Sequence, residues 1–491
     1  MHIRWEIARG ISEQTLVDIH GAMLSILAQT GLRIFSPDLD DQLLRDRLGG
    51  TPGVSFAGDR VYFAADLVES LLDEYRQDHS VDQTWPEDTA TIPAALPSHV
   101  FYILDPACDA FRPCDRQNLA LALRLARAFA DDGVSGICPG YPSEAPVALR
   151  ELARFKLNSE CGGSMMMPRP YEVSSRDRDP SVYAFLKEMS AVIDGNDHPF
   201  ADIVGVHPIS PLRLEGDEFD NALYLWRTEL GDRMRVSIGN MPMAGVSAPV
   251  DFPSAFAQSI AEAVGSWLFF RLLLGRGHAE FSFNVYPFDM KYGSFAYGAP
   301  EDLIVAMARR DLYAYYHVGA NWADKALHTM AHAPDAQAAG EKAPKVLGCL
   351  LAGAKRFSGI GGLCLDEGWS PEQMVIDLEI LHWARHVARG VESSGIDMAA
   401  RVAEGIANGG DFLSLESTLQ GYRESFWMPD LFEHAMKSVW EQAGGKTVRE
   451  AAHAKIAVAL RQEPFMLSDE KRIALEEIYR RAEIELATAP A

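Results

Sequence analysis

The stretch Met234-Arg-Val-Ser-Ile238 is a short apolar run that ends at Gly239-Asn240, and the long apolar stretch Ala255 to Gly275 follows it. A short run closed by Gly, Pro or Asn and followed by a helical pattern indicates a βα unit. Runs of this kind recur along the middle of the chain; seven are clear and an eighth is not. The seven are Val134 to Cys138, Ser164 to Met167, Ile203 to Val206, Met234 to Ile238, Ala279 to Phe283, Tyr313 to Val318 and Ile360 to Leu365.

This alternation predicts an α/β fold, specifically a (β/α)₈ TIM barrel. We expect an N-terminal helical cap over residues 1–97, the barrel over residues 98–370, and a C-terminal helical extension over residues 371–491 that packs on the barrel. Alternating strands and helices also make a doubly wound open sheet, but no Gly-x-Gly-x-x-Gly motif opens a helix after an early strand. The pattern therefore favours the barrel.

Helical spacing and turn residues predict the elements of the cap and of the extension. In the cap they are a helix from Ser12 to Gln29, a helix from Asp40 to Leu48, a strand at Val61-Tyr-Phe63, a helix from Ala65 to Asp78 and a Pro-rich loop from Thr84 to Pro97. In the extension they are the helices Pro371 to Val391, Met398 to Ala407, Pro429 to Gln442, Val448 to Leu460 and Asp469 to Ala487, with an irregular segment from Asp411 to Met428.

The composition indicates which binding partners and which cellular compartment to expect. The balance of 45 basic against 69 acidic residues gives a net charge of −24, which repels nucleic acid and anionic membranes and attracts cations. The six cysteines form no Cys-x-x-Cys pair, which predicts a reducing compartment without a disulfide framework or a zinc knuckle. The charged start Met1 to Glu6 shows no signal peptide, so we expect a cytoplasmic protein. The sequence is also compatible with a homo-oligomer.

In a parallel barrel the active site lies at the C-terminal strand ends, where the loops converge. The stretch Phe281 to Pro300 follows one predicted strand, is broken by Pro287, Gly293 and Gly298, and carries seven aromatic residues. Such a loop either packs beneath the cap or lines a pocket. Aromatic faces attract quaternary ammonium groups, which offer no hydrogen-bond donor, so a pocket here predicts a methylated ammonium ligand.

The candidate substrate-binding residues come from this stretch and from neighbouring strand ends. They are Asn284, Tyr286, Phe288, Asp289, Tyr292, Tyr297, Trp322, Glu367 and Trp369. Some have a purely structural alternative: Asp289 and Glu367 can form salt bridges, and Asn284 can cap a helix. His207 and His278 are possible general bases, although a single His beside a strand is more often a structural residue. No residue is assigned a catalytic role.

Several motifs resemble the trimethylamine methyltransferase (MttB-like) family. They are Gly239-Asn-Met-Pro-Met-Ala-Gly-Val-Ser-Ala-Pro-Val250, Ala261-Glu262 and Asp335-Ala-Gln-Ala-Ala-Gly-Glu-Lys342, with supporting stretches in the cap (Ile19-His to Ile34, Arg60 to Glu69) and the tail (Asp377-Leu-Glu379, Phe412-Leu413, Thr418). The resemblance implies a corrinoid-dependent amine methyltransferase (EC 2.1.1) that transfers a methyl group from a methylated amine to the Co(I) of a corrinoid, which is free or carried by a small corrinoid-binding protein. It places His207, Asn240 and Met243 toward the corrinoid.

The chain departs from the family pattern at two points. Trimethylamine-specific members carry pyrrolysine, whereas this chain has only the ordinary residues, which implies the branch that uses a quaternary amine such as glycine betaine. A neutral tertiary amine then leaves, so no tightly bound metal is expected. Ser417 stands before Thr418 where the family pattern has His.

Two other functions remain open. One is a zinc- or thiolate-dependent methyltransferase acting on methanol or a thiol, for which Cys138, Cys161 or Cys364 would converge on a metal. The other is a non-catalytic corrinoid-partner protein on the same scaffold, which would lack the pocket rings.

Overall fold

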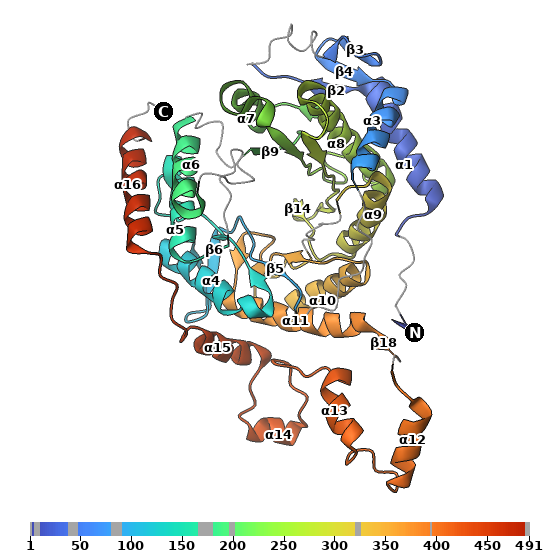
Figure 1. Cartoon of the computed structure of the whole chain (residues 1–491), viewed down its shortest axis with the longest axis vertical. Coiled ribbons are helices and arrows are strands. Elements are labelled where there is room, and N and C mark those ends of the chain that lie inside the picture. Colours follow the sequence, from blue (N-terminus) through green and yellow to red (C-terminus); the bar gives the residue numbers. More distant parts are fainter. Residues whose placement is uncertain are drawn as a thin grey trace.

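The computed structural model describes residues 2–3, 10–37, 48–79, 91–164, 180–195, 202–319, 326–392 and 395–486. Helices surround short central strands in a ring, and the extension projects from one side of it (Figure 1). The helices of the ring are α4 (Arg116–Ala128), α5 (Arg150–Glu160), α6 (Pro180–Asp194), α7 (Asp217–Leu225), α8 (Phe252–Leu274), α9 (Pro300–Tyr316), α10 (Ala336–Leu351) and α11 (Pro371–Arg389). Shorter segments are the π-helical η1 (Ile26–Thr30) and η6 (Trp226–Leu230) and the 3₁₀ turns η2 (Ala130–Asp132), η3 (Val147–Leu149) and η7 (Gly231–Arg233).

A three-stranded parallel sheet forms one part of the ring. Its strands are β9 (Ile203–Val206), β11 (Arg235–Ile238) and β12 (Ala279–Phe281), in the order β12-β11-β9. The helices α7 and α8 connect consecutive strands, as the βα pattern predicts. All three strands were predicted because each is an apolar run closed by a turn residue.

A second parallel sheet brings together strands from the beginning and the end of the region of alternating strands and helices. It has the order β15-β5-β8, with β15 (Phe357–Ser358), β5 (Ala94–Ala95) and β8 (Val134–Ser135). Phe357 pairs with Ala94 in parallel, and Ala94 pairs with Val134. The stretch Thr84 to Pro97 was therefore wrongly predicted to be only a loop.

One predicted strand is wrong, and a second pairs differently from the expectation. The run Tyr313 to Val318 mostly belongs to α9, because Leu312 and Tyr316 lie four residues apart on its buried face. The run Ile360 to Leu365 contains β16 (Gly362–Leu363), which pairs antiparallel with β17 (Gly368–Trp369) instead of joining the parallel sheet. β17 in turn pairs in parallel with β6 (Tyr102–Asp105), whose other neighbour is the antiparallel β7 (Ala110–Pro113).

The α/β class is confirmed, whereas closure of one eight-stranded barrel stays a prediction. Within the described residues the parallel strands form separate hydrogen-bonded sheets. Most of the predicted strand Ser164 to Met167 lies outside the described residues. The division into cap, barrel and extension likewise stays a prediction.

The N-terminal region packs directly on the first parallel sheet. It contains α1 (Glu13–Ser25), capped by Ser12, the strands β2 (Leu32–Ile34), β3 (Val54–Ala57) and β4 (Arg60–Phe63), and α3 (Ala65–Asp78). β2 pairs in parallel with β10 (Arg213–Leu214), in the loop after β9. Gly265 of α8 allows close contact, because an added Cβ would lie 2.9 Å from Leu27 Cδ2. The predicted helix Asp40 to Leu48 lies almost wholly outside the described residues.

The extension has a packed part and a projecting part. α15 (Val448–Ala459) packs against α11, and α16 (Asp469–Leu486) packs against α6. α12 (Met398–Ala407), α13 (Glu416–Ser425) and α14 (Lys437–Gln442) project from the ring (Figure 1). The short pair β1 (His2–Ile3) and β18 (Val391–Glu392) lies at the start of the projecting part. α13 occupies the segment predicted to be irregular, and only the end of Pro429 to Gln442 is helical, as α14.

None of the helices in the described ranges is long and apolar enough to cross a membrane.

Candidate active site

A fully buried carboxylate, that of Glu262 on α8, connects the loops at the ends of β9 and β11. Its Oε2 accepts hydrogen bonds from Ser210 Oγ at 2.8 Å and Asn240 Nδ2 at 3.0 Å. Its Oε1 accepts from the backbone N–H of Leu212 at 3.1 Å and from Gln258 Nε2 at 2.9 Å. Burial raises the pKa of Glu262, and these four donors oppose that shift. Because a buried carboxylate needs partners in place of water, the four bonds fix both loops relative to α8.

Asn240 extends this network to the end of β12. Its Oδ1 accepts a hydrogen bond from the backbone N–H of Asn284 at 3.2 Å and from Ser259 Oγ at 3.0 Å. Ser259 Oγ also lies 2.6 Å from the carbonyl oxygen of Asn284. The side-chain oxygen of Asn284 accepts from Val285 N–H at 2.9 Å, within its own loop. The structure thus brings Asn240 and Asn284 together and uses both to hold the backbone.

The loops after β11 and β12 then run side by side. Met243 and Tyr286 form a parallel β-bridge, with Ala244 N–H donating to Tyr286 O at 2.9 Å and Tyr286 N–H donating to Pro242 O at 2.9 Å. This pairing places two of the predicted site residues, Met243 and Tyr286, next to each other. The position of the Tyr286 ring therefore depends on both strand ends.

Three aromatic rings gather at this point. The ring of Tyr286 stands at 68° to that of Phe295, with centroids 5.2 Å apart, and at 73° to that of Tyr297. Phe295 and Tyr297 stack, and the ring of Tyr297 also contacts the imidazole of His328, with centroids 5.4 Å apart. Burial raises the pKa of Tyr297, and the negative charge of Asp366 adds to this rise. Tyr286 and Tyr297 are buried and Phe295 is half-buried, and the cluster lies within the field of a carboxylate.

The remaining predicted residues of the aromatic stretch form a hairpin. β13 (Phe288–Asp289) pairs antiparallel with β14 (Ser294–Phe295). Asp289 Oδ1 accepts from the backbone N–H groups of Lys291 at 2.7 Å and Tyr292 at 3.2 Å, which stabilises the turn. Tyr292 lies at the tip with 71% of its side chain exposed, and the Lys291 amine sits 4.6 Å from its ring centroid. Tyr292 is therefore separate from the buried rings.

His207 follows β9 and is held by one carboxylate. Glu218 Oε2 lies 2.8 Å from both the backbone nitrogen and the Nδ1 of His207. The other ring nitrogen faces the end of β11, since a Cβ added at Gly239 would lie 3.0 Å from His207 Nε2. Glu218 thus fixes the imidazole with Nε2 directed at the end of β11. His278, the other candidate base, instead contacts the Met234 carbonyl at the start of β11 through Nδ1.

The sheet face that continues from these strand ends is polar and accessible. Along β11, Val236 and Ile238 are buried against the helices, whereas Arg235 and Ser237 are exposed on the opposite face. Glu280 of β12 is exposed on that same face. A packed barrel interior would bury these alternate residues. The face of β11 and β12 that carries Arg235, Ser237 and Glu280 is therefore polar and exposed.

Glu367 and Trp369 lie near another strand end. The carbonyl oxygen of Glu367 accepts from Phe101 N–H at 2.8 Å and Tyr102 N–H at 3.0 Å, while its side chain is exposed. Trp369 is fully buried, and its indole N–H donates to the Ile360 carbonyl at 3.0 Å. Trp369 packs in a different hydrophobic cluster from β12 and its helices. Trp322 lies outside the described residues.

A buried ion pair supports the turn that leads to Trp369. Lys342 Nζ lies 2.8 Å from Asp377 Oδ2, and both side chains are fully buried. Lys342 also donates to the Gly362 carbonyl at 2.8 Å, and Gly361 N–H donates to Asp377 Oδ2 at 2.7 Å. Gln373 donates to the other oxygen of Asp377 at 2.7 Å. Lys342 and Asp377, which both match the family pattern, thus hold the backbone turn at Gly361 and Gly362 in place.

The three cysteines that were considered as metal ligands have pKa values raised by burial. Burial raises the pKa of Cys138 to about 12 and that of Cys161 to about 11. Burial also raises the pKa of Cys364 to about 11, although its sulfur lies 3.2 Å from His332 Nδ1. Among the described residues, no group of three or more His, Cys, Asp or Glu side chains is arranged to hold a metal ion.

The family model described as trimethylamine methyltransferase (MTTB) matches residues 4–486. The chain belongs to this family. It is 29% identical over 230 residues to trimethylamine methyltransferase MttB1 of Methanosarcina mazei, a match that covers 46% of each chain, so it spans about half the length of that relative. Longer matches are the glycine betaine methyltransferase of Desulfitobacterium hafniense strain Y51, 23% identical over 91% of each chain, and the trimethylamine methyltransferase MttB of strain DCB-2, 22% identical over 98% of this chain and 95% of the relative.

Sequence reasoning missed three parts of this arrangement. Phe295 was counted among the aromatic residues but not selected, and His328 was not considered. Glu262 was selected only as a match to the family pattern. It is the one carboxylate in the apolar stretch Ala255 to Gly275, and a buried carboxylate needs several hydrogen-bond donors, so its position was a usable signal. The role of each depends on contacts between distant segments.

Proposed function

We propose that this protein transfers a methyl group from a quaternary methylated amine, such as glycine betaine, to the Co(I) of a corrinoid bound by a small partner protein. Membership of the family gives the reaction class, and the near-full-length match to a protein named glycine betaine methyltransferase supports the substrate. The observation that carries the proposal is the ring cluster Tyr286, Phe295 and Tyr297 at the end of β12.

The ring cluster has the chemistry to recognise an N-methyl cation. The rings of Tyr286 and Tyr297 stand at 73° to each other and so offer aromatic surfaces in two directions, unlike a flat stack. A quaternary ammonium is attracted to aromatic faces and needs no hydrogen-bond acceptor. Asp366 adds a negative potential at Tyr297. In this proposal Phe288 and Asp289 form the outer wall through the β13–β14 hairpin, and Asn284 sets its start.

The strand-end loops are suited to contact a large cofactor presented from outside. Met241, Val246 and Val250 follow β11, Met290 lies on the hairpin, and between 44% and 74% of each side chain is exposed. A Cβ added at Gly245 would lie 3.4 Å from Met290 Cε and 3.7 Å from Val250 Cγ2, so these loops adjoin. Exposed apolar side chains gathered at one rim are suited to a docking partner. We propose that this rim, with Met243 and His207 behind it, holds the corrinoid and its carrier.

The residues of this chain would act by position and by exclusion of water. The bound corrinoid supplies the electron pair that accepts the methyl group. The hydrogen-bond network of Glu262 and Asn240, here called the clamp, would fix the ends of β9, β11 and β12. The rings would hold the ammonium nitrogen so that one of its methyl groups points outward. Positioning of this kind contributes at most about 7 to 11 kcal/mol to lowering a barrier. The departing amine is neutral, so its loss needs no acid.

Neither alternative function has an observation in its favour. A thiolate-dependent mechanism would need Cys138, Cys161 or Cys364 in a group of metal ligands, and among the described residues no group of three or more His, Cys, Asp or Glu side chains is arranged in that way. A non-catalytic scaffold protein would have lost its pocket rings, whereas Tyr286 and Tyr297 are present and in contact.

The test is methyl transfer in an anaerobic mixture of the protein, free cob(I)alamin and one N-methylated compound. Glycine betaine is the expected substrate, and trimethylamine, choline and carnitine serve as comparisons. The corrinoid absorbance and the formation of dimethylglycine by NMR are followed together. If none of the N-methylated compounds is demethylated, with free cobalamin or with a corrinoid protein, the proposal is wrong.

A further inference from the structure

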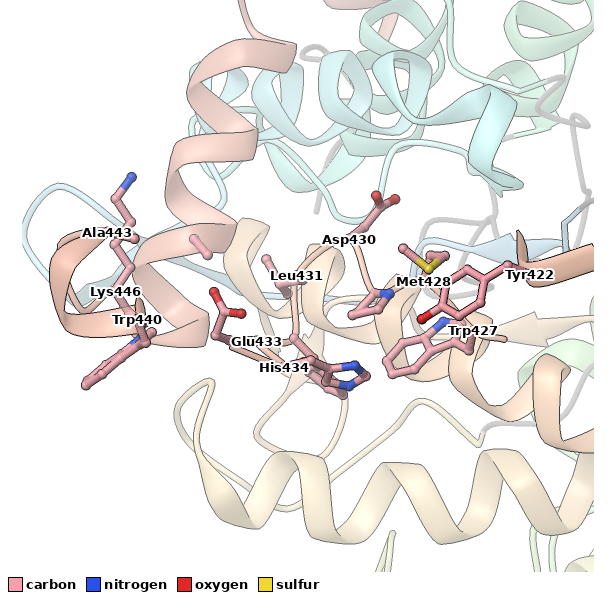
Figure 2. A pocket seen from close by; sticks show the side chains of 13 residues that line it. Tyr422, Trp427, Met428, Asp430, Leu431, Glu433, His434, Trp440, Ala443 and Lys446 are labelled. Atoms are coloured by element: carbon pink, nitrogen blue, oxygen red, sulfur yellow. Dashed lines mark hydrogen bonds between the residues drawn. The ribbon is translucent and has the colours of Figure 1, made fainter. Parts of the chain in front are cut away.

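The C-terminal extension contains a cleft of about 510 Å³ far along the chain from the strand ends (Figure 2). Five aromatic or imidazole side chains contribute to its lining. They are Tyr422, Trp427, Phe432, His434 and Trp440. Tyr422, Trp427 and Met428 lie at one end, and Trp440, Ala443 and Lys446 lie at the other (Figure 2). The proposed methyl-transfer site uses none of these residues.

The rings at the Trp427 end form a corner. The indole of Trp427 stands at 83° to the ring of Phe432, with centroids 6.0 Å apart. It stands at 70° to the imidazole of His434, with centroids 5.6 Å apart. Near-perpendicular rings are walls of a box, whereas stacked rings would cover one another. The cleft of about 510 Å³ that these rings line has room for a rounded apolar group beside their surfaces.

The loop that carries this corner is anchored to the body of the protein. Glu379 of α11 is 2% exposed, and its Oε1 accepts three backbone hydrogen bonds, from Asp430 at 3.0 Å, Leu431 at 2.9 Å and Phe432 at 3.0 Å. Leu431 is buried in the core against α11. An aromatic corner on a loop fixed in this way loses little entropy when a ligand binds.

Of the two carboxylates that line the cleft, that of Glu433 is left to attract a cation, because Asp430 is paired with Lys455. Asp430 and Glu433 both line it, and Asp430 lies 3.6 Å from Lys455. Glu433 Oε1 accepts the Ala435 N–H at 2.6 Å and has no ion pair with any described residue. The lining cation, Lys446, is at the end remote from Trp427 (Figure 2). The overall charge of −24 acts in the same direction.

We propose that this cleft binds a methylated ammonium group, as a second site distinct from the one at the strand ends. Aromatic faces and a nearby carboxylate attract a quaternary ammonium more strongly than a neutral group of the same shape. The inference is independent of the methyl-transfer chemistry, because it rests only on the rings, the anchor and the charge of the extension.

The test compares choline with 3,3-dimethyl-1-butanol, its neutral carbon isostere, by calorimetric titration of the intact protein. Choline is expected to bind and the neutral isostere to bind about tenfold more weakly or not at all. Trp427→Leu, which keeps an apolar side chain without an indole, is expected to weaken choline binding in this cleft by about tenfold, and Trp427→Phe less. Glu433→Gln keeps the acceptor for Ala435 and is expected to weaken binding by a few-fold and to reduce its salt dependence.

Met436→Ala is the matched control, because Met436 is on the same loop, 79% exposed and absent from the lining. It is expected to leave choline binding unchanged. Equal binding of choline and its neutral isostere, or binding that Trp427→Leu does not alter, would overturn the proposal. Loss of methyl transfer in all assays, with choline binding to the cleft intact, would instead count against the proposed function alone.

Discussion

The carboxylate of Glu262 and the amide of Asn240, on α8 and at the end of β11, are joined by a 3.0 Å hydrogen bond inside the protein core. Through Asn240 the bond reaches the backbone of Asn284, and Tyr286 lies two residues further on. One buried carboxylate therefore links the ends of three strands to the first ring of the candidate site.

Glu262→Ala is expected to lower the free energy of unfolding by about 3 to 5 kcal/mol, because it leaves several buried donors without an acceptor. Glu262→Gln keeps the size of the side chain but turns an amide toward the donors, so it is expected to cost less than the alanine variant. Urea unfolding measures both. The exposed Glu301→Ala on α9 is the control, expected to change stability by less than about 0.5 kcal/mol. If Glu262→Ala is no more destabilising than Glu301→Ala, the clamp does not contribute as described.

Asp377→Ala is expected to destabilise the fold by about 3 to 5 kcal/mol, since it leaves the ammonium of Lys342 buried without a charge partner. The double variant Lys342→Met, Asp377→Leu removes both charges and is expected to recover a large part of that loss. Lys437→Ala provides a matched exposed pair, because Lys437 and Glu441 are 80% and 52% exposed and their ion pair contributes about 0.5 kcal/mol or less. A double variant as unstable as Asp377→Ala would contradict this account.

The buried thiols predict both a reactivity and a pH dependence. Cys114 and Cys138 have pKa values raised by burial from 9.0 to about 12, which lowers their thiolate fraction at pH 8 by about a thousandfold. In the native protein the exposed Cys108 is expected to react with iodoacetamide first, as peptide mapping would show. Rapid native alkylation of Cys138 would contradict the structure.

The same shifts make stability decline in alkali. Above pH 9 these thiols ionise in the unfolded chain but stay protonated in the folded one until about pH 12, so the unfolded state releases protons and becomes favoured. Stability is therefore expected to fall as the pH rises from 9 toward 12. Substitution of both cysteines by alanine should flatten this part of the pH profile measured by denaturant unfolding.

Tyr297→Leu is expected to lower kcat/KM for glycine betaine by about tenfold, because it removes an aromatic face from the proposed cage. Tyr297→Phe keeps the ring and is expected to retain most of the activity. The control is Tyr224→Leu on α7, where the side chain is 38% exposed and outside the cluster. Activity of Tyr297→Leu equal to that of Tyr224→Leu would show that the ring does not contact the substrate.

The strands with a complete local signal could be predicted from sequence. Ile203–Val206 and Arg235–Ile238 combine an apolar run with a closing turn residue, and both are as expected. Ala94–Ala95 could not be found in this way, because two alanines among prolines become a strand only through pairing with Phe357 and Val134. The run from Tyr313 was wrongly predicted to be a strand because its aromatic residues are typical of strands. It belongs to the end of α9, where Leu312 and Tyr316 lie four residues apart and are both buried.

In the candidate site, too, the residues with a local sequence signal could be predicted and the contacts between distant segments could not. Tyr286 and Tyr297 could be selected because an aromatic loop broken by Gly and Pro must bury its rings or line a pocket. The contact of Tyr297 with His328 could not be predicted, since it brings together two loops that share no pattern. Whether Tyr297 or the exposed Tyr292 lies inward is decided by the β13–β14 turn, which the sequence alone does not orient.

The pairing of Ala94 with Phe357 also delays completion of this sheet during synthesis of the chain. At translation rates of about 5 to 20 residues per second, the ribosome needs on the order of tens of seconds to deliver Phe357 after Ala94 has emerged. During that interval one edge of β5 is exposed without its partner strand, and an unpaired edge is a place where chains associate. A chaperone that shields residues 91–164 of the nascent chain would therefore improve the yield of this protein more than one that acts after synthesis ends.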